Sequence, residues 1–157
     1  MITYIVGDAT DPQGQGKKMI VHVCNDIGAW GLGFVVPLGT KFPKAKDEYK
    51  KLKADSGKRI PLGTVQFVDV AAEIVVANMV AQRGIVGQAP GTRPLSYDAL
   101  LECLEKAGEH AQKNDLSIHA PRFGAGLAGG DWDVIALFIE KTLIGKFGRA
   151  VTIYDLK

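Results

Sequence analysis

The stretches IVHVCNDIGAWGLGF (residues 20–34) and IHAPRFGAGLAGG (residues 118–130) share one pattern, an apolar run followed by a glycine-rich segment. Glycines allow a backbone to approach a ligand closely and to turn its N–H groups inward. Where such a loop also opens a helix, the unpaired N–H groups and the positive end of the helix dipole favour an anion, typically a phosphate. The two loops therefore predict a ligand with a diphosphate or similar group, held from both sides.

Short apolar runs rich in Val and Ile recur along the chain, and such runs are typical of strands. Most are apolar on both faces, which predicts central strands covered by helices on both sides. Residues 65–69 alternate more, and a turn at residues 71–73 predicts a hairpin with the following run. The expected strands are Ile2–Val6, Met19–Cys24, Val65–Val70, Ile74–Met79, Ile118–Pro121 and Ala150–Tyr154.

Helical patterns fit between these runs. Residues 34–53 predict one or two helices interrupted at Pro43, and the apolar residues from Tyr97 to Ala111 follow one helical stripe with Ser96 as the N-cap. Residues 133–144 begin with acidic residues and are long enough for a buried helix. Residues 11–18 and 84–93 predict exposed loops. The alternation predicts one three-layer α/β domain over residues 1–157, with a mostly parallel sheet.

Composition narrows the class of protein. A chain of 157 residues is long enough to bury a core without disulfides or metals. The formal net charge is +2 and the basic residues are scattered, which argues against a general nucleic-acid surface. Cys24 and Cys103 make no disulfide framework, the first residues lack a signal-peptide pattern, and no apolar run approaches the ~20 residues of a membrane span. We expect a cytoplasmic protein without membrane partners, with a monomer as the default oligomeric state.

Several familiar sites are disfavoured. Residues 124–129 match the dinucleotide pattern G-x-G-x-x-G, and Asp155 at the end of the next strand partly meets its need for an acidic residue. Only two residues follow Asp155, however, so a dinucleotide-dependent oxidoreductase is a remote alternative. The alternative to a phosphate-binding loop is a tight turn that binds no ligand. So many glycines would then cost backbone entropy on folding without a function to explain them. No glycine loop ends in Lys-Ser or Lys-Thr, which excludes a Walker loop. The histidines and cysteines lack zinc-type spacing, so we expect neither a metal nor a cofactor.

Polar residues mark the ends of the expected strands. The Asp8 carboxylate is expected either to cap a turn or to accept a hydrogen bond from an exocyclic amine such as that of adenine. Asn25 offers a donor and an acceptor to a sugar hydroxyl. Asp26 is either a local base or a loop cap, and Tyr154 either lies against a base or packs at the core edge. His22, Cys24 and His119 lie in apolar runs, which favours a core or supporting role over a nucleophile pair.

Together these pieces resemble the macrodomain family of ADP-ribose-binding modules. The resemblance runs from Tyr4 to Leu156. It rests on GDAT at residues 7–10, HVCN at 22–25, WGLGF at 30–34 and PRFGAGL at 121–127, in that order. Within the family, the chain is most similar to the subgroup of terminal ADP-ribose–protein glycohydrolases, yeast ADP-ribose-1″-phosphate phosphatases and bacterial relatives.

The resemblance implies a mixed six-stranded sheet between helical layers, with ADP-ribose lying across the strand ends. Asp8 would hold the adenine amine and Asn25 would contact the distal ribose, while the two glycine loops would enclose the diphosphate and the distal ribose. The ligand-binding residues that it implies are Asp8, Ala9, Asn25, Trp30, Gly31, Leu32, Gly33, Phe34, Arg122, Phe123, Gly124, Ala125, Gly126, Leu127 and Tyr154.

The resemblance also bears on catalysis. The terminal glycohydrolases use a lysine nucleophile after the fourth strand and an aspartate just past the second glycine loop, where this chain has Gln82 and Ala128. Glutamine cannot form the covalent adduct, and alanine is neither acid nor base. The implied activity is therefore hydrolysis of ADP-ribose from an acidic side chain or another O- or N-linked acceptor, nucleic acid included, by a water that the substrate's phosphate holds. The catalytic candidates are Asn25, Gln82 and Asp26; a non-catalytic reader and an ADP-ribose-1″-phosphate phosphatase are the alternatives.

Overall fold

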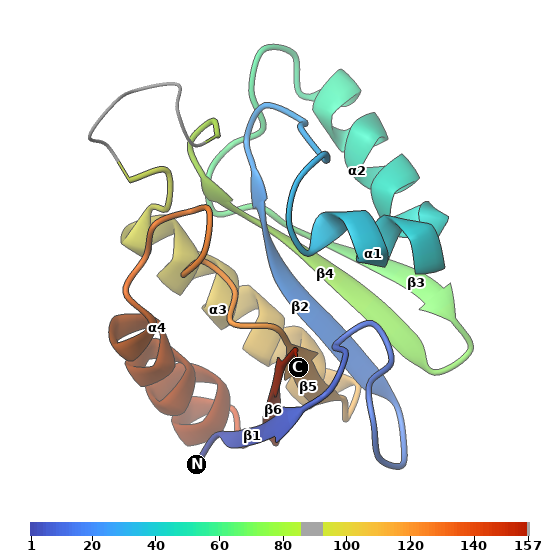
Figure 1. The fold of residues 1–157 in the computed structure, drawn as a ribbon, viewed down its shortest axis with the longest axis vertical. Coiled ribbons are helices and arrows are strands. Elements are labelled where there is room, and N and C mark those ends of the chain that lie inside the picture. The colour runs from blue at the N-terminus through green and yellow to red at the C-terminus, as the bar shows by residue number, and fades with distance from the viewer. Residues whose placement is uncertain (86–92, 157) are drawn as a thin grey trace.

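A six-stranded sheet runs through the centre of the protein in the order β1-β6-β5-β2-β4-β3 (Figure 1). The computed structural model describes residues 1–85 and 93–156. Every neighbouring pair of strands is parallel except β3 and β4, which form the expected antiparallel hairpin. The strands are β1 Thr3–Val6, β2 Lys18–Asn25, β3 Val65–Ala71, β4 Ile74–Gln82, β5 Ser117–Ala120 and β6 Val151–Asp155.

All six expected strands are present, and the mixed, mostly parallel sheet is confirmed. The largest difference in bounds lies at β4, which extends three residues beyond Met79 to Gln82. The extension forms because the end of β4 pairs with the end of β2, where a register shift between Cys24 and Asn25 brings Asn25 opposite Gln82. Gln82 is therefore the last residue of the strand and not part of the loop after it.

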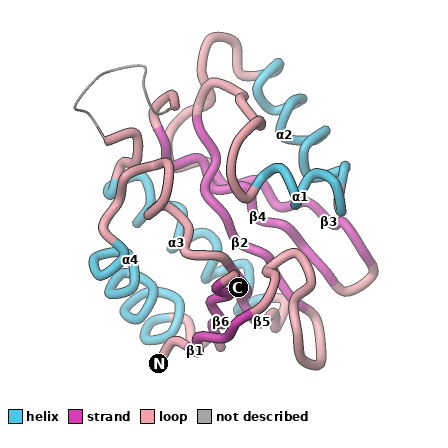
Figure 2. The backbone as a smooth tube through the Cα atoms, in the orientation of Figure 1, coloured by secondary structure: helices cyan, strands magenta, loops and turns pink. Residues whose placement is uncertain are grey.

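Helices cover both faces of the sheet (Figure 2). Helices α1 (Val35–Lys41) and α2 (Pro43–Asp55) pack on one face, and α3 (Tyr97–Lys113) and α4 (Trp132–Ile139) pack on the other. The interruption at Pro43 is confirmed, because Phe42 leaves the helical region with φ −128° and ψ 76°, and a following proline disfavours helical backbone at the residue before it. The Ser96 N-cap is also confirmed, since its side chain accepts a hydrogen bond from the Ala99 N–H.

The last helical segment differs from the expectation of a buried helix. Helix α4 begins at Trp132 and continues in wider turns as a π-helix, η1 (Glu140–Lys146). Only one stripe of the segment, Ile135, Ile139 and Leu143, is fully buried, whereas Leu137 is 51% exposed. The segment is apolar on more than one side, but it packs at the outer edge of the helical layer and can bury only the side that meets the core.

The two expected loops have different outcomes. Residues 11–17 form an irregular and mostly exposed connection between β1 and β2, as expected, and Lys18 is already the first residue of β2. In the second expected loop, residues 84–93, Gly84 is buried and not exposed, and residues 86–92 lie outside the described residues. Within residues 1–85 and 93–156, none of the helices combines the length and apolar character that crossing a bilayer requires.

Candidate functional site

The carboxyl ends of five parallel strands meet along one edge of the sheet, which is where open α/β sheets bind ligands. Asp8 follows β1, while Asn25 and Gln82 end β2 and β4. The second glycine loop leaves β5 at Pro121. Side chains and loops that are far apart in the sequence are thus brought to one edge of the sheet.

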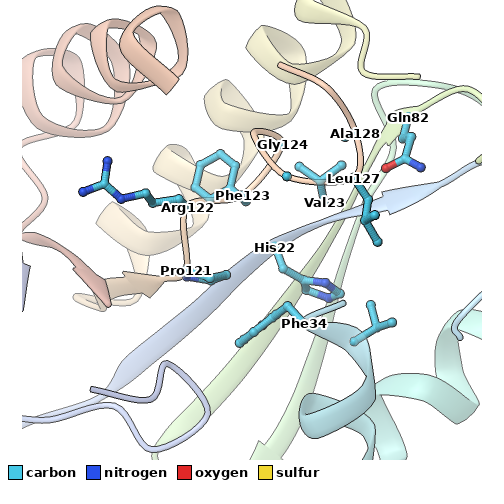
Figure 3. Close-up of a pocket in the computed structure, with 12 residues that line it drawn as sticks. His22, Val23, Phe34, Gln82, Pro121, Arg122, Phe123, Gly124, Leu127 and Ala128 are labelled. Carbon is cyan, nitrogen blue, oxygen red and sulfur yellow. The ribbon is translucent and has the colours of Figure 1, made fainter. Parts of the chain in front are cut away.

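A cavity of about 160 Å³ opens at this edge (Figure 3). His22 and Val23 of β2 contribute to its lining from the sheet, and Phe34 and Val35 contribute from the start of α1. The second glycine loop supplies the facing wall through Pro121, Arg122, Phe123, Gly124, Gly126, Leu127 and Ala128. The two glycine-rich segments therefore face one another across a hollow.

A second hollow of about 140 Å³ adjoins the first, and Gln82 and Leu127 line both. The rest of its lining comes from the first glycine loop and the end of β4: Asn25, Ala29, Gly31, Leu32 and Ile85. A long ligand that filled both hollows would pass Gln82 at their junction.

The second loop is rigidly built around its glycines. Gly124 has a left-handed φ of 78°, and a Cβ there would lie 3.1 Å from Ile135 and 3.2 Å from Leu95. The Gly130 N–H donates to the carbonyl of Gly124 at 2.8 Å, which closes the loop on itself. Gly126 differs, because a Cβ at that position would meet no protein atom within 4 Å. One glycine thus shapes the loop, and the other leaves space beside the cavity.

The Asn25 side chain stabilises the first loop through hydrogen bonds to its backbone. Its Oδ1 accepts hydrogen bonds from the backbone N–H groups of Ile27 and Ala29 at 3.1 and 3.0 Å, and from the Tyr49 hydroxyl at 2.9 Å. Its Nδ2 donates to the Ala29 carbonyl at 2.8 Å. The acceptor that the sequence offered to a sugar is therefore occupied, and only the second amide N–H of Asn25 is left for a ligand.

Asp26 has the environment of a loop cap. The side chain is buried, and both of its oxygens lie 3.1 Å from a guanidinium nitrogen of Arg59. Its Oδ1 also accepts a hydrogen bond from the Gly84 N–H at 2.8 Å. These bonds tie the chain after β2 to the chain after β4, and they favour the capping interpretation over that of a base.

Two aromatic residues of the predicted site are packed into the protein. Trp30 is 7% exposed, lies 5.4 Å from the Tyr49 ring, and does not line either hollow. Tyr154 is 3% exposed; its hydroxyl accepts from the Gln13 N–H at 2.8 Å and pairs with His119 Nδ1 at 2.7 Å. Tyr154 thus packs at the core edge, and a side chain so covered presents little surface to a base.

Asp8 forms the turn that its sequence position suggested. Its Oδ1 accepts from the backbone N–H and the hydroxyl of Thr10 at 2.9 and 2.8 Å. The carboxylate is exposed, whereas the next residue, Ala9, is buried. Both hydrogen bonds fall on one oxygen, so the turn and a contact between the other oxygen and a ligand are compatible.

The Arg122 guanidinium points away from the cavity (Figure 3). It makes a bidentate pair with Asp155 at 2.7 and 3.0 Å, and it lies over the rings of Tyr4 and Trp132 at 5.0 and 5.3 Å. The neighbouring Phe123 is buried. This cluster holds the start of the second loop in place. Both carboxylate oxygens of Asp155 accept hydrogen bonds from Arg122, whereas a dinucleotide site would need this acidic residue to bind a ribose hydroxyl.

His22 lines the cavity, which the sequence did not indicate. It is 2% exposed, and burial lowers its pKa to about 4, so that the ring is neutral near pH 7. Burial also raises the pKa of the Cys24 thiol well above its usual value, so the two side chains are no nucleophile pair. Val35 and Pro121 were missed as lining residues too; no local pattern marks them, because the cavity arises from the meeting of separate segments.

Gln82 and Ala128 are the residues that the resemblance places where the terminal glycohydrolases have their lysine and aspartate. The Gln82 Nε2 donates to the Gly84 carbonyl at 3.0 Å, and the side chain is half-buried at the junction of the two hollows. Ala128 is 5% exposed and its carbonyl accepts from the Leu95 N–H at 3.1 Å. Across residues 1–85 and 93–156, no three His, Cys, Asp or Glu side chains gather as a metal site would require.

A mostly parallel sheet between two helical layers, with a cavity between two glycine loops at its strand ends, defines an α/β/α domain. Solved structures show to which family it belongs. A macrodomain protein from Streptomyces coelicolor is 38% identical, with 99% of each chain covered and a TM-score of 0.85. A protein of unknown function from Bacteroides thetaiotaomicron is 44% identical, with 99% of this chain and 98% of that chain covered and a TM-score of 0.94. The chain belongs to the macrodomain family.

More distant proteins share the fold or part of the sequence. A mutant macrodomain from Oceanobacillus iheyensis with ADPR is 20% identical, with 98% and 83% of the chains covered and a TM-score of 0.70. An ADP-ribose 1″-phosphate phosphatase from Candida albicans is 45% identical over 53 residues, 32% of this chain and 34% of that protein. Chromodomain-helicase-DNA-binding protein 1-like from Danio rerio is 28% identical over 90% of this chain, which spans only 14% of that protein. No family model matches the sequence.

Proposed function

We propose that this macrodomain binds ADP-ribose across the two hollows and hydrolyses it from a modified acceptor. The observation that carries the proposal is the pair of glycine loops that face each other over the cavity, one of them with open space at Gly126. Backbone N–H groups in such loops bind phosphate oxygens without a cationic side chain. The solved macrodomain with bound ADPR supports this choice of ligand.

The predicted contacts divide along the ligand. Asp8 and Ala9 bind the adenine end, where the second carboxylate oxygen of Asp8 accepts from the exocyclic amine. The loop residues from Gly31 to Phe34 and from Gly124 to Leu127 enclose the diphosphate and the distal ribose. Asn25 contributes its remaining amide N–H to the distal ribose, and Arg122 and Phe123 line the cavity at the start of the second loop. Trp30 and Tyr154 support these segments from buried positions.

The nucleophile of the proposed hydrolysis is a water molecule near Gln82. The water oxygen forms a bond to C1″ of the distal ribose while the bond from C1″ to the acceptor atom breaks. The electron pair leaves with the acceptor atom, and the proton lost by the water passes to that atom or to solvent. The ligand's own diphosphate stabilises the positive charge that develops at C1″, and Gln82 orients the water. Asp26 supports the loop instead of acting as the base, because Arg59 and the Gly84 N–H occupy its oxygens.

A non-catalytic reader is the second candidate. The observation that favours it is the identity of two residues that line the first hollow, Gln82 and Ala128, neither of which can act as an acid or a base. A phosphatase of ADP-ribose-1″-phosphate would use the same cavity, and the local similarity to the Candida albicans enzyme supports it.

Two measurements test the proposal. Calorimetry with ADP-ribose, NAD and AMP should give the tightest binding for ADP-ribose, whereas a preference for NAD would refute the ligand. Incubation with glutamate-linked ADP-ribosyl protein and with ADP-ribosylated thymidine in DNA should release free ADP-ribose from at least one substrate. Tight binding without release from either would leave the reader, and free phosphate from ADP-ribose-1″-phosphate would identify the phosphatase.

A further inference from the structure

A chain of buried and partly buried hydrogen bonds runs from helix α2 to the cavity and ends at His22. Gln66 of β3 donates from Nε2 to the backbone carbonyl of Glu48 at 2.9 Å. Asn78 of β4 donates from Nδ2 to the backbone carbonyl of Ala45 at 3.2 Å and to Gln66 Oε1 at 3.0 Å. Asn78 Oδ1 then lies 2.5 Å from His22 Nε2.

The two backbone carbonyls fix the direction of every bond in this chain. A carbonyl oxygen can only accept, so both side-chain amides must turn their NH₂ groups toward α2. The Asn78 oxygen consequently faces His22, and the imidazole must donate to it from Nε2. In the neutral ring the proton is therefore on Nε2 and the lone pair is on Nδ1.

The same imidazole touches the aromatic residues at the two ends of the segment WGLGF. Its ring lies edge-on to Trp30 at 5.5 Å and tilted to Phe34 at 5.8 Å, and Figure 3 shows it beside Phe34 in the cavity. Trp30 and Phe34 flank the residues that line the second hollow, Gly31 and Leu32. The His22 ring therefore neighbours both aromatic residues that flank this part of the first loop.

We propose that His22 is a positioning residue of the ligand site: the amide chain through Gln66 and Asn78 holds it as the Nε2–H tautomer, and in that neutral form it sets the first glycine loop through Trp30 and Phe34. Protonation of Nδ1 would place a charge among apolar and aromatic side chains and displace the loop. The consequence for ADP-ribose affinity rests on the proposed function, whereas the tautomer and the ring contacts do not.

His22 is the group of this cluster that can change charge between about pH 4 and 7. On β2 itself, the Cys24 sulfur lies 3.8 Å from Nε2 and stays a thiol, because burial raises its pKa. From α2, Tyr49 packs against Trp30 and stays a phenol, because burial raises its pKa as well. From β4 and β3 the facing groups are the neutral amides of Asn78 and Gln66.

The tautomer is tested on the unmodified protein. Long-range ¹H–¹⁵N NMR of the imidazoles distinguishes a protonated from a bare nitrogen, and the chain has only three histidines to assign. His22 should show a protonated Nε2 and a bare Nδ1 at pH 7. A protonated Nδ1, or a rapid mixture of the two tautomers, would overturn the proposal without any variant having to fold.

The ring contact is tested by fluorescence. In the Trp132→Phe protein, Trp30 is the sole tryptophan. Its emission should be quenched as His22 gains a proton, with a midpoint near pH 4. Asn78→Asp should move the midpoint upward, because a carboxylate stabilises the imidazolium. His22→Gln should abolish the titration. His110→Gln should leave it unchanged, because His110 is half-buried on α3 and stacks on Phe67, not on Trp30. Quenching that survives His22→Gln would contradict the contact.

The link to the ligand is tested at pH 7. His22→Gln should weaken ADP-ribose binding at least about fivefold, the effect of roughly one kcal/mol, while His110→Gln should leave it unchanged. Equal affinity of the folded His22→Gln and unmodified proteins would refute the positioning role. If the unmodified protein itself does not bind ADP-ribose, the proposed function fails, and the NMR and fluorescence results still decide whether His22 is held as inferred.

Discussion

Two glycines of the second loop, only two residues apart, should respond to substitution in opposite ways. Gly126 does not adopt a left-handed φ, and a Cβ there meets no protein atom within 4 Å. The Gly126→Val protein should therefore fold. Replacing a glycine lowers the conformational entropy of the unfolded chain, which raises the free energy of unfolding by a few tenths to about 1 kcal/mol when the native conformation suits the new residue. The melting temperature should stay the same or rise slightly.

The ligand should respond differently to Gly126→Val. The isopropyl group would stand in the space beside the cavity, where we expect the diphosphate to approach the backbone. Calorimetry should show at least about a tenfold loss of ADP-ribose affinity, or about 1.4 kcal/mol. If the folded variant keeps its affinity within a factor of about two, the second loop does not enclose the ligand and the reasoning from the glycines is wrong.

Gly124→Ala is the matched variant. Its φ of 78° lies in the left-handed region, and the new Cβ would press on Leu95 and Ile135. A left-handed residue with a side chain costs roughly 1–2 kcal/mol, and 1 kcal/mol shifts the melting temperature of a domain of this size by roughly 2–4 °C. Gly124→Ala should thus melt several degrees lower, as thermal unfolding would measure. A melting temperature unchanged by Gly124→Ala would contradict the interpretation of that residue as the shaping glycine.

Three further outcomes follow from other residues. Asp8→Ala should weaken ADP-ribose binding by about 1–3 kcal/mol through loss of a charge-assisted hydrogen bond, as calorimetry would show, and an unchanged affinity would remove Asp8 from the adenine contact. Gln82→Ala should lower the rate of ADP-ribose release more than the affinity, because the amide orients water; an equal loss in both would indicate that Gln82 only binds. Acid should destabilise the fold, because burial lowers the pKa of both His22 and His119 to about 4, against about 6.5 for an unfolded histidine. The unfolded chain then binds more protons between these values, so stability is lost as the pH falls from about 6.5 to 4, by about 3 kcal/mol for each histidine. Urea unfolding at several pH values measures this, and the loss should be smaller in His22→Gln than in the unmodified protein.

The sequence predicted the elements well because their signals are local. Runs such as residues 74–79 are apolar on both faces apart from Asn78, and such a run is typical of a strand that is buried on both faces. Pro43 interrupts the helical stretch through its own covalent geometry, and Ser96 caps α3 by a bond three residues away. The extension of β4 to Gln82 was not predictable in this way, because it depends on pairing with Asn25, far away in the chain.

The site was predictable in position and less so in detail. Glycines at strand ends indicate a ligand edge from sequence alone, since the topology brings those ends together. The partner of each polar group depends on which segments meet. Arg59 binds Asp26 across 33 residues, and Tyr49 binds Asn25 across 24. A carboxylate or amide that looks free in the sequence is therefore already bound in the fold.

This prior engagement of polar groups predicts how the proposed hydrolysis should depend on pH. An acid–base catalyst must exchange a proton with the substrate during the reaction. Around the described cavity, Asp26 is held by Arg59 and Gly84, and burial keeps the His22 ring neutral and the Cys24 thiol protonated. Stabilisation by backbone N–H groups and by the ligand's own diphosphate needs no titrating side chain. The rate of ADP-ribose release should consequently be nearly constant from about pH 6 to 8, apart from the intrinsic pH dependence of the linkage, which the uncatalysed reaction measures. A bell-shaped profile in that range, absent from the uncatalysed reaction, would show that a side-chain acid and a side-chain base do act. The catalytic groups would then have to be side chains that are already hydrogen-bonded within the fold.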